Sequence, residues 1–332
     1  MKGVAILMMI FLHLFNQGSN VELCHNFIQI NGLPLVEILS RASNPVAFFL
    51  ILGGYGMYKV YEKGDRHRWS RVGRLYINYW ITLAIFLLIG WCLNSSRYPG
   101  SWQTVISNFS GFHTTYNGEM WFLLPYVILS LLSPWIFRLY RHFNPWGIIA
   151  STLFIHLCTS FCISRYGSFF LFHNYWVYNP LLVFHLLFNF SLGAMAARSH
   201  FFERLANHSK SFRTDIPATC GIIVLVFISC VFKYNFFYAF GIITCLLFVP
   251  MPGMLKTVLA KLGDMSMNMW MIHSWFCYYL FHDFIYSFSY PVLIFLVTTL
   301  ISYFSARMVA MLSKPVENIF MSRKELNTKP IL

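Results

Sequence analysis

Long apolar blocks alternate with short polar connections along the whole chain. A helix needs about 20 residues to cross the hydrocarbon core of a bilayer, and most blocks are close to that length. Backbone groups in lipid must hydrogen-bond to one another, so we expect the blocks to be helices. The strands of a membrane barrel would alternate polar and apolar residues, and the blocks do not. The pattern predicts ten membrane helices, at Lys2–Asn16, Asn44–Tyr61, Leu75–Leu93, Glu119–Phe137, Trp146–Ile163, Pro180–Ala197, Pro217–Phe232, Asn235–Val249, Ser266–Phe284 and Tyr290–Leu312.

Composition points the same way. Of the 332 residues, 58% are apolar and 11% are charged, and the mean hydropathy is +0.59. A soluble domain has about a quarter of its residues charged. The sequence therefore predicts an all-α polytopic integral membrane protein, with residues 1–332 forming a single domain.

Basic residues are distributed unevenly between the predicted connections. The net charge of +13 would suggest a nucleic-acid partner in a soluble protein. If the N-terminus is cytoplasmic, however, 20 of the 24 basic residues fall on the inner side, and the outer side holds only Arg41, Arg97, Arg165 and Lys233. Cytoplasmic loops of membrane proteins show this excess. We expect both termini in the cytoplasm, the lipid bilayer as a partner, and no nucleic acid.

The first block and the cysteines carry weaker signals. A basic residue before a short apolar run also begins a secretory signal, but no small-residue cleavage site follows, so we expect an uncleaved first helix. Seven of the eight cysteines lie inside apolar blocks. We interpret them as packing residues, and no metal site is predicted.

Lys2 and His13 are placed on one face of the first predicted helix. His13 stands eleven positions after Lys2, which corresponds to three helical turns plus about 20° and separates them by about 16 Å along the axis. A cation would then lie at the cytoplasmic rim below an imidazole inside the membrane, where ionisable groups are functional candidates. A packed histidine and an ordinary flanking lysine remain the alternative interpretation.

Arg71 and Arg74 stand at positions i and i+3 near the start of another predicted helix. Side chains at this spacing face the same way. A guanidinium suits bidentate phosphate binding, and the free N–H groups of a helix start add to the attraction. The alternative is plain positive charge at the cytoplasmic surface.

Two further residues could take part in chemistry. Glu119 begins the fourth predicted helix, where it could act as an acid/base partner or bind a sugar hydroxyl, although an acidic residue there also favours the helix dipole. His273 lies within the patterned run Leu262–His273, and we rank it above the other histidines predicted inside the membrane, His156, His185 and His282.

Several short segments occur in a recognisable order along nearly the whole chain. They are Lys2–Leu7 with His13, Phe48–Tyr55, Arg71–Trp80, Trp121–Leu123, Phe190–Met195 with Gly193, and Ser266–His273. Together they resemble the type-3 membrane acyltransferase family, polytopic O-acyltransferases that modify envelope sugars. The chain departs from the family pattern in having Lys2 for the usual arginine, Gly53 for the usual serine and Asn78 for the usual proline.

The resemblance implies a reaction. The donor substrate would be acetyl-CoA or another acyl-CoA, with no permanently bound cofactor, and the acceptor a hydroxyl of a cell-surface polysaccharide or lipid-linked sugar. His13 would be the central catalytic residue, as general base or transient acyl acceptor. Lys2, Arg71 and Arg74 would hold the CoA phosphates, with Glu119 and His273 as further catalytic candidates. The expected location is the bacterial cytoplasmic (inner) membrane.

A transporter or flippase for a glycan or lipid intermediate is the alternative. No inverted repeat is visible, and Asp283 is the only acidic residue placed well inside a predicted helix. A coupled carrier usually has broken helices and more intramembrane charge. The sequence therefore favours the acyltransferase.

Overall fold

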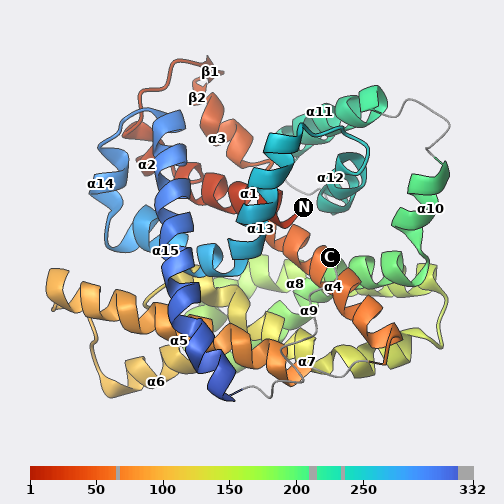
Figure 1. The fold of residues 1–332 in the computed structure, drawn as a ribbon, viewed down its shortest axis with the longest axis horizontal. Coiled ribbons are helices and arrows are strands. Elements are labelled where there is room, and N and C mark those ends of the chain that lie inside the picture. Colours follow the sequence, from red (N-terminus) through yellow and green to blue (C-terminus); the bar gives the residue numbers. More distant parts are fainter. Residues whose placement is uncertain (65–67, 209–214, 233–235, 321–332) are drawn as a thin grey trace. The chain divides into compact units, whose positions relative to one another are not determined.

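The computed structural model describes residues 1–64, 68–208, 215–232 and 236–320. Within these ranges the chain is almost entirely helical, and the only strands form a two-stranded antiparallel hairpin. The chain, drawn in Figure 1, divides into two compact units built from interleaved segments.

The first unit comprises Met1–Phe48, Ile81–Tyr98 and Leu205–Lys314. Its main elements are α1 (Lys2–Phe15), α2 (Gly18–Glu22), β1 (Gln29–Ile30), β2 (Leu33–Pro34), α3 (Leu35–Ser40), α11 (Asp215–Val231), α12 (Tyr238–Leu246), α13 (Gly253–Ser274), the π-helical turn η3 (Trp275–Tyr279), α14 (His282–Tyr286) and most of α15 (Pro291–Phe320).

The second unit comprises Phe49–Trp80, Pro99–Arg204 and the chain from Pro315 onward. Its main elements are most of α4 (Pro45–Glu62), the first half of α5 (Arg68–Leu93), α6 (Trp102–Ser110), the 3₁₀ turn η1 (Gly118–Phe122), α7 (Leu123–Tyr140), α8 (Pro145–His173), α9 (Tyr175–Arg198) and the start of α10 (Phe201–His208).

Within the described residues every predicted apolar block overlaps a helix, and the all-α membrane class is confirmed. Asn235, where the eighth predicted helix begins, lies outside the described residues. Among the described residues, six helical stretches are long and apolar enough to cross a membrane, namely Leu35–Glu62, Arg68–Leu93, Gly118–Tyr140, Pro145–His173, Tyr175–Arg198 and Pro291–Phe320. The apolar helices α1 and α11 are shorter, at 14 and 17 residues. Ten crossings and two cytoplasmic termini therefore stay predictions.

The ninth predicted helix is wrong as a single element. The sequence indicated one helix over Ser266–Phe284, but α13 begins earlier, at Gly253, and ends at Ser274. A π-helical turn and the short α14 follow. The short elements α2, α3, α6 and α10 were not predicted, because they are too brief to show an apolar period.

The helix α8 buries its small and polar side chains and exposes its large apolar ones, as a helix in lipid is expected to do. Its buried stripe consists of Ile148, Thr152, His156, Thr159 and Gly167, which is mostly polar or small. Large apolar side chains cover the rest of the helix, including Trp146, Phe154, Phe161 and Phe169, each more than half exposed. Apolar exposure on this scale would be a liability in water and is expected against hydrocarbon chains.

Two glycines let α4 and α9 touch backbone to backbone in the second unit. A Cβ atom on Gly54 would lie 2.0 Å from the carbonyl oxygen of Phe190, and one on Gly193 would lie 1.9 Å from the carbonyl oxygen of Ile51. Gly54 faces Phe190, and Ile51 faces Gly193, so residue numbers fall along one helix as they rise along the other. The two helices therefore run antiparallel. Small residues of this kind allow membrane helices to gain close van der Waals contact.

α1 and α13 pack side by side in the first unit. A Cβ atom on Gly3 would lie 2.1 Å from the carbonyl oxygen of Leu259, near the start of both helices. His13 and His273 meet ten or more residues further along each helix. The two helices are therefore parallel, and their N-terminal ends lie together.

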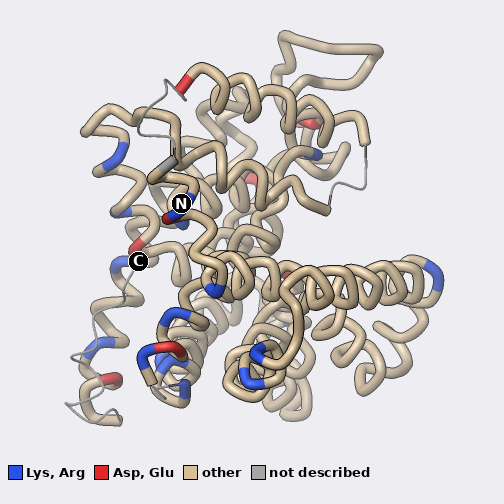
Figure 2. The backbone as a smooth tube through the Cα atoms, turned by 90° about the vertical axis from the view of Figure 1, so that its right-hand side faces the viewer, with Lys and Arg blue, Asp and Glu red and all other residues tan. Residues whose placement is uncertain are grey.

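Charged residues are concentrated away from the middle of the helices. Figure 2 shows most Lys and Arg positions at or close to helix ends, with long uncharged stretches of tube between them. This is the distribution that a hydrocarbon core imposes, because an unpaired charge at its centre is costly.

Candidate functional site

Two histidines far apart in sequence meet in the first unit. The ring centroids of His13 on α1 and His273 on α13 are 5.1 Å apart. His13 is 9% exposed, and His273 is fully buried. The structure thus brings together two of the three residues that sequence reasoning proposed for chemistry.

Hydrogen bonds fix the protonated nitrogen of His273. Its Nδ1 lies 2.8 Å from the carbonyl oxygen of Trp270 and 3.2 Å from that of Met269. A carbonyl oxygen only accepts, so Nδ1 carries the proton and Nε2 the lone pair. Among the described residues, Nε2 has no hydrogen-bond partner, although it is buried. An unsatisfied buried acceptor calls for an explanation, and a catalytic role is one of those that such groups have.

Tyr278 and Asn16 orient His13. The Tyr278 hydroxyl donates to the Asn16 side-chain oxygen at 3.0 Å and lies 3.3 Å from His13 Nδ1. Since the single hydroxyl proton goes to Asn16, the hydroxyl oxygen accepts from His13 Nδ1–H. His13 Nε2 is then the ring nitrogen that carries the lone pair. A base held by a second group, itself held by a third, is the arrangement that activates nucleophiles in many enzymes.

The π-helical turn η3 places Tyr278. Leu280 N–H bonds to the Trp275 carbonyl oxygen five residues earlier, at 2.9 Å. Trp275 anchors the turn, because it is fully buried and stacks on Phe86 with centroids 5.1 Å apart. π-Helical turns inside helices occur frequently at functional sites. Sequence reasoning missed Tyr278, because an aromatic residue in an apolar run gives no signal unless the five-residue turn is known.

Cations gather at the opposite end of the α1–α13 pair. Lys2 on α1 and Lys256 and Lys261 on α13 are all exposed, and each lies on the N-terminal part of its helix. Helix N-termini also carry partial positive charge. One end of this parallel pair is therefore positive, and its two imidazoles lie further along.

Arg71 and Arg74 lie in the second unit, on the first turns of α5. They are partly buried, and their i, i+3 spacing puts them on one face of the helix. No salt bridge found within the described part of the chain includes either guanidinium. Their role in binding an anionic ligand stays a prediction.

Glu119 also lies in the second unit, in the 3₁₀ turn η1 at the start of α7. Its backbone N–H donates to the Asn117 side chain at 3.2 Å, which caps the turn. The side chain is partly buried. Its placement as an acid/base partner stays a prediction, since it belongs to a different unit from His13.

Two of the other histidines predicted inside the membrane, His156 and His185, pair in the second unit. The third, His282, lies on α14 of the first unit, 3.0 Å from the Asp283 carboxylate. The rings of His156 and His185 stack with centroids 4.2 Å apart, and His156 Nδ1 donates to the His185 carbonyl oxygen at 2.7 Å. His185 Nδ1 also lies 3.3 Å from the Ser160 hydroxyl. These contacts join α8 to α9, which supports a packing role.

Comparison with known proteins supports one family. The sequence profile of an acyltransferase domain matches residues 1–307. No curated protein and no solved structure gives a significant match. The matched range includes every candidate residue in both units. The chain belongs to the type-3 acyltransferase family and is an integral membrane acyltransferase.

Proposed function

We propose that this protein moves an acetyl or other short acyl group from cytoplasmic acyl-CoA to a hydroxyl of a cell-surface glycan. The observation that carries the proposal is the contact between His13, His273 and Tyr278 in a chain that belongs to an acyltransferase family. The expected location is the bacterial cytoplasmic membrane, with the acceptor on its outer side.

His13 performs the central step. Its Nε2 removes the proton of the acceptor hydroxyl, whose oxygen attacks the carbonyl carbon of the thioester. The carbon–sulfur bond breaks, and CoA takes up the proton and leaves as a thiol. In a second route Nε2 itself attacks the thioester carbonyl carbon, the carbon–sulfur bond breaks, and CoA leaves as a thiolate. The acceptor hydroxyl oxygen then displaces the imidazole from the acyl group, and the hydroxyl proton passes to the CoA thiolate. Both routes need the Nδ1–H tautomer that Tyr278 holds.

The donor is bound through its phosphates. In the first unit, Lys2, Lys256 and Lys261 supply the cations for this binding. Arg71 and Arg74 of the second unit are proposed as phosphate ligands on the resemblance to the family alone. The thioester arm follows α1 from Lys2 toward His13, a rise of about 16 Å along the helix. No observation favours a carrier, and Asp283, the acid expected inside a helix, is fully exposed on α14.

The function is tested in membranes that contain the protein and receive radiolabelled acetyl-CoA. Label should enter a glycan fraction and be released by mild alkali, as an O-acyl ester is. Membranes lacking the protein provide the control. A flippase would give no protein-dependent label, and that result would overturn the proposal.

Replacing both arginines tests donor binding. The double variant Arg71→Gln/Arg74→Gln should raise KM for acetyl-CoA by at least about 100-fold and change kcat little, because each of the two charged hydrogen bonds that it removes contributes about 1.5–3 kcal/mol. The matched control is Arg68→Gln on the same helix, whose guanidinium instead lies 4.4 Å from the Trp135 ring centroid. An unchanged KM in the double variant would contradict donor binding by these arginines and would favour the alternative, in which they only add positive charge at the cytoplasmic surface.

Removing the Tyr278 hydroxyl tests the orientation of His13. Tyr278→Phe should lower kcat about tenfold and alter the pH profile of kcat, because His13 loses the acceptor that fixes its tautomer. KM for acetyl-CoA should stay the same. Tyr303→Phe on α15 serves as the control. A Tyr278→Phe enzyme with the parental pH profile would show that the hydroxyl has no positioning role.

A further inference from the structure

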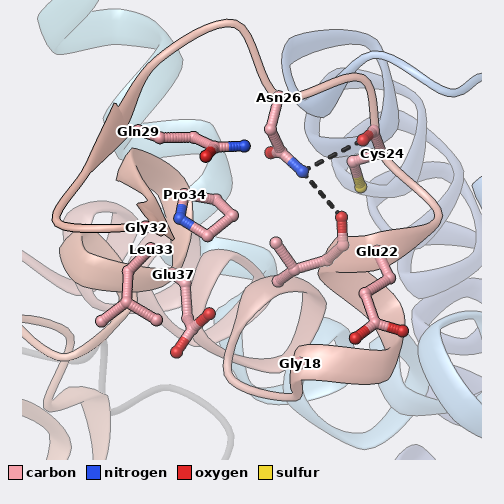
Figure 3. A pocket seen from close by; sticks show the side chains of 10 residues that line it. Gly18, Glu22, Cys24, Asn26, Gln29, Gly32, Leu33, Pro34 and Glu37 are labelled. Carbon is pink, nitrogen blue, oxygen red and sulfur yellow. Dashed lines mark hydrogen bonds between the residues drawn. The ribbon is translucent and has the colours of Figure 1, made fainter.

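A polar pocket opens on the segment that follows α1 (Figure 3). Its volume is about 450 Å³, within the range of about 300–1,000 Å³ found for small-molecule sites. It begins five residues after His13, and its lining comes from α2, the β1–β2 hairpin, α3 and the loop between them: Gly18, Val21, Glu22, Cys24, Asn26, Gln29, Gly32, Leu33, Pro34 and Glu37.

The loop around the pocket is held by hydrogen bonds. The Asn26 side-chain amide donates to the carbonyl oxygens of Val21 at 2.8 Å and Cys24 at 3.0 Å. His25 N–H donates to the Ser289 carbonyl oxygen at 2.8 Å, which ties the loop to the chain after α14. These bonds preform the site, so a ligand need not order the loop first.

The hairpin turn adds to this rigidity. Asn31 and Gly32 have φ angles of 51° and 77°. This left-handed pair is the geometry that an Asn-Gly sequence favours in a two-residue hairpin. Gln29, on the strand before the turn, is thereby held at the pocket.

The polar groups of the pocket suit a ligand rich in hydroxyls. Figure 3 shows the Gln29 amide extended toward Asn26, with Glu22 on α2 and Glu37 on α3 on the opposite side. Amides both donate and accept, whereas carboxylates accept strong hydrogen bonds from hydroxyl groups. Val21, Leu33 and Pro34 supply apolar surface for the carbon side of a sugar ring.

The negative charge at the pocket favours binding of an uncharged acceptor over binding of the anionic donor. The segment from Asn16 to Ser40 contains two glutamates and no lysine or arginine. Arg41 offsets one of them, since it lies 3.3 Å from Glu37. A polyanion such as CoA would be repelled by the remaining carboxylate. Burial raises the pKa of the Cys24 thiol to about 11, so this side chain is uncharged at neutral pH.

α2 and α3, which form two sides of the pocket, both pack against α1. The Tyr286 hydroxyl donates to the Leu14 carbonyl oxygen at 2.8 Å, next to His13, and so ties α14 to the same end of α1. The pocket and the His13 end of α1 are therefore parts of one packed group within the first unit. From this juxtaposition we propose that the pocket binds an uncharged glycosyl unit of the acceptor and rejects acidic sugars. This inference rests on the proposed function and names its acceptor class.

Saturation-transfer NMR on the purified full chain in nanodiscs, without acetyl-CoA, tests the pocket. The probes are the methyl glycosides of glucose, galactose, mannose, rhamnose and N-acetylglucosamine, with methyl glucuronide as the acidic comparison. At least one neutral glycoside should bind, and the glucuronide should bind at least about tenfold more weakly. Failure of all neutral probes to bind, or equal binding of the glucuronide, would overturn the proposal.

Variants assign the binding to this pocket. Gln29→Ala should weaken the neutral glycoside at least about fivefold, and Glu22→Gln should reduce the discrimination against glucuronide. The control is Asp283→Asn. Asp283 is an exposed carboxylate of the same unit, and it does not line the pocket. Binding of the glycosides at the parental level in both pocket variants would contradict the assignment of the binding to this pocket.

His13→Ala separates the pocket from the reaction. This variant should bind the glycoside as well as the parent does, because His13 does not line the pocket. Sugar binding without any acyl transfer in the parent would contradict the enzymatic function alone. Acyl transfer that is unaffected by Gln29→Ala and Glu22→Gln would contradict the pocket alone.

Discussion

His13→Ala should abolish acyl transfer while leaving the amount of folded protein unchanged. A general base contributes about 10²- to 10⁴-fold to rate, and a transient acyl acceptor cannot be replaced at all. The loss should therefore be at least about 100-fold in kcat. The measurement is the initial rate of label transfer from acetyl-CoA to alkali-labile glycan, normalised to protein in the membrane.

His156→Ala is the matched control for that experiment. His156 is also a membrane histidine with 9% exposure, but it pairs with His185 in the second unit. Its removal tests the cost of deleting a buried imidazole from a helix contact, and the rate per folded molecule should stay near the parental value. A His13→Ala protein that works within threefold of the parent would remove His13 from the mechanism.

Gly54→Leu and Gly193→Leu should each prevent the second unit from folding. A Cβ at either position would lie within about 2 Å of a backbone carbonyl oxygen on the facing helix, and a backbone oxygen cannot rotate away as a side chain can. Overpacking a core costs about 1–3 kcal/mol when side chains can shift, so separating two helix backbones should cost more. Size-exclusion chromatography of a fluorescent fusion should show loss of the monodisperse peak.

The neighbouring glycine offers a strict comparison. A Cβ on Gly53 would meet only the Tyr126 ring, at 3.5 Å, which is an ordinary contact. Gly53→Ala should therefore keep the monodisperse peak, and Gly53→Ser, the residue usual in the family, should do so as well. Equal tolerance at Gly53 and Gly54 would contradict the α4–α9 contact described above.

The sequence identified most of the candidate residues but not which of them meet. The spacing of Lys2 and His13 follows from helix geometry, so one face of α1 could be predicted without a structure. The run before His273 marked that histidine as well. Tyr278 could not be predicted, because it reaches His13 through a π-helical turn whose hydrogen bonds depend on how Trp275 packs.

The contacts also show a structural role for two glycines of the family motifs. Gly54 and Gly193 are landmarks of the resemblance, and their role is close helix packing, since each meets a backbone carbonyl. Of the histidines that the sequence placed inside the membrane, His13 meets His273 and His156 meets His185, whereas His282 lies beside Asp283. No periodicity within one helix reveals which residue of another helix lies opposite.

The amino-acid sequence alone determined that this chain forms apolar helices in a membrane, because hydrophobicity and helix length are local properties summed over about 20 residues. It also determined which side chains are ionisable within those helices. Only the tertiary structure decided which of them meet, and where a polar pocket forms beyond α1. The reason is physical: contacts between residues 13 and 273, or 54 and 190, depend on the packing of helices that are distant in sequence.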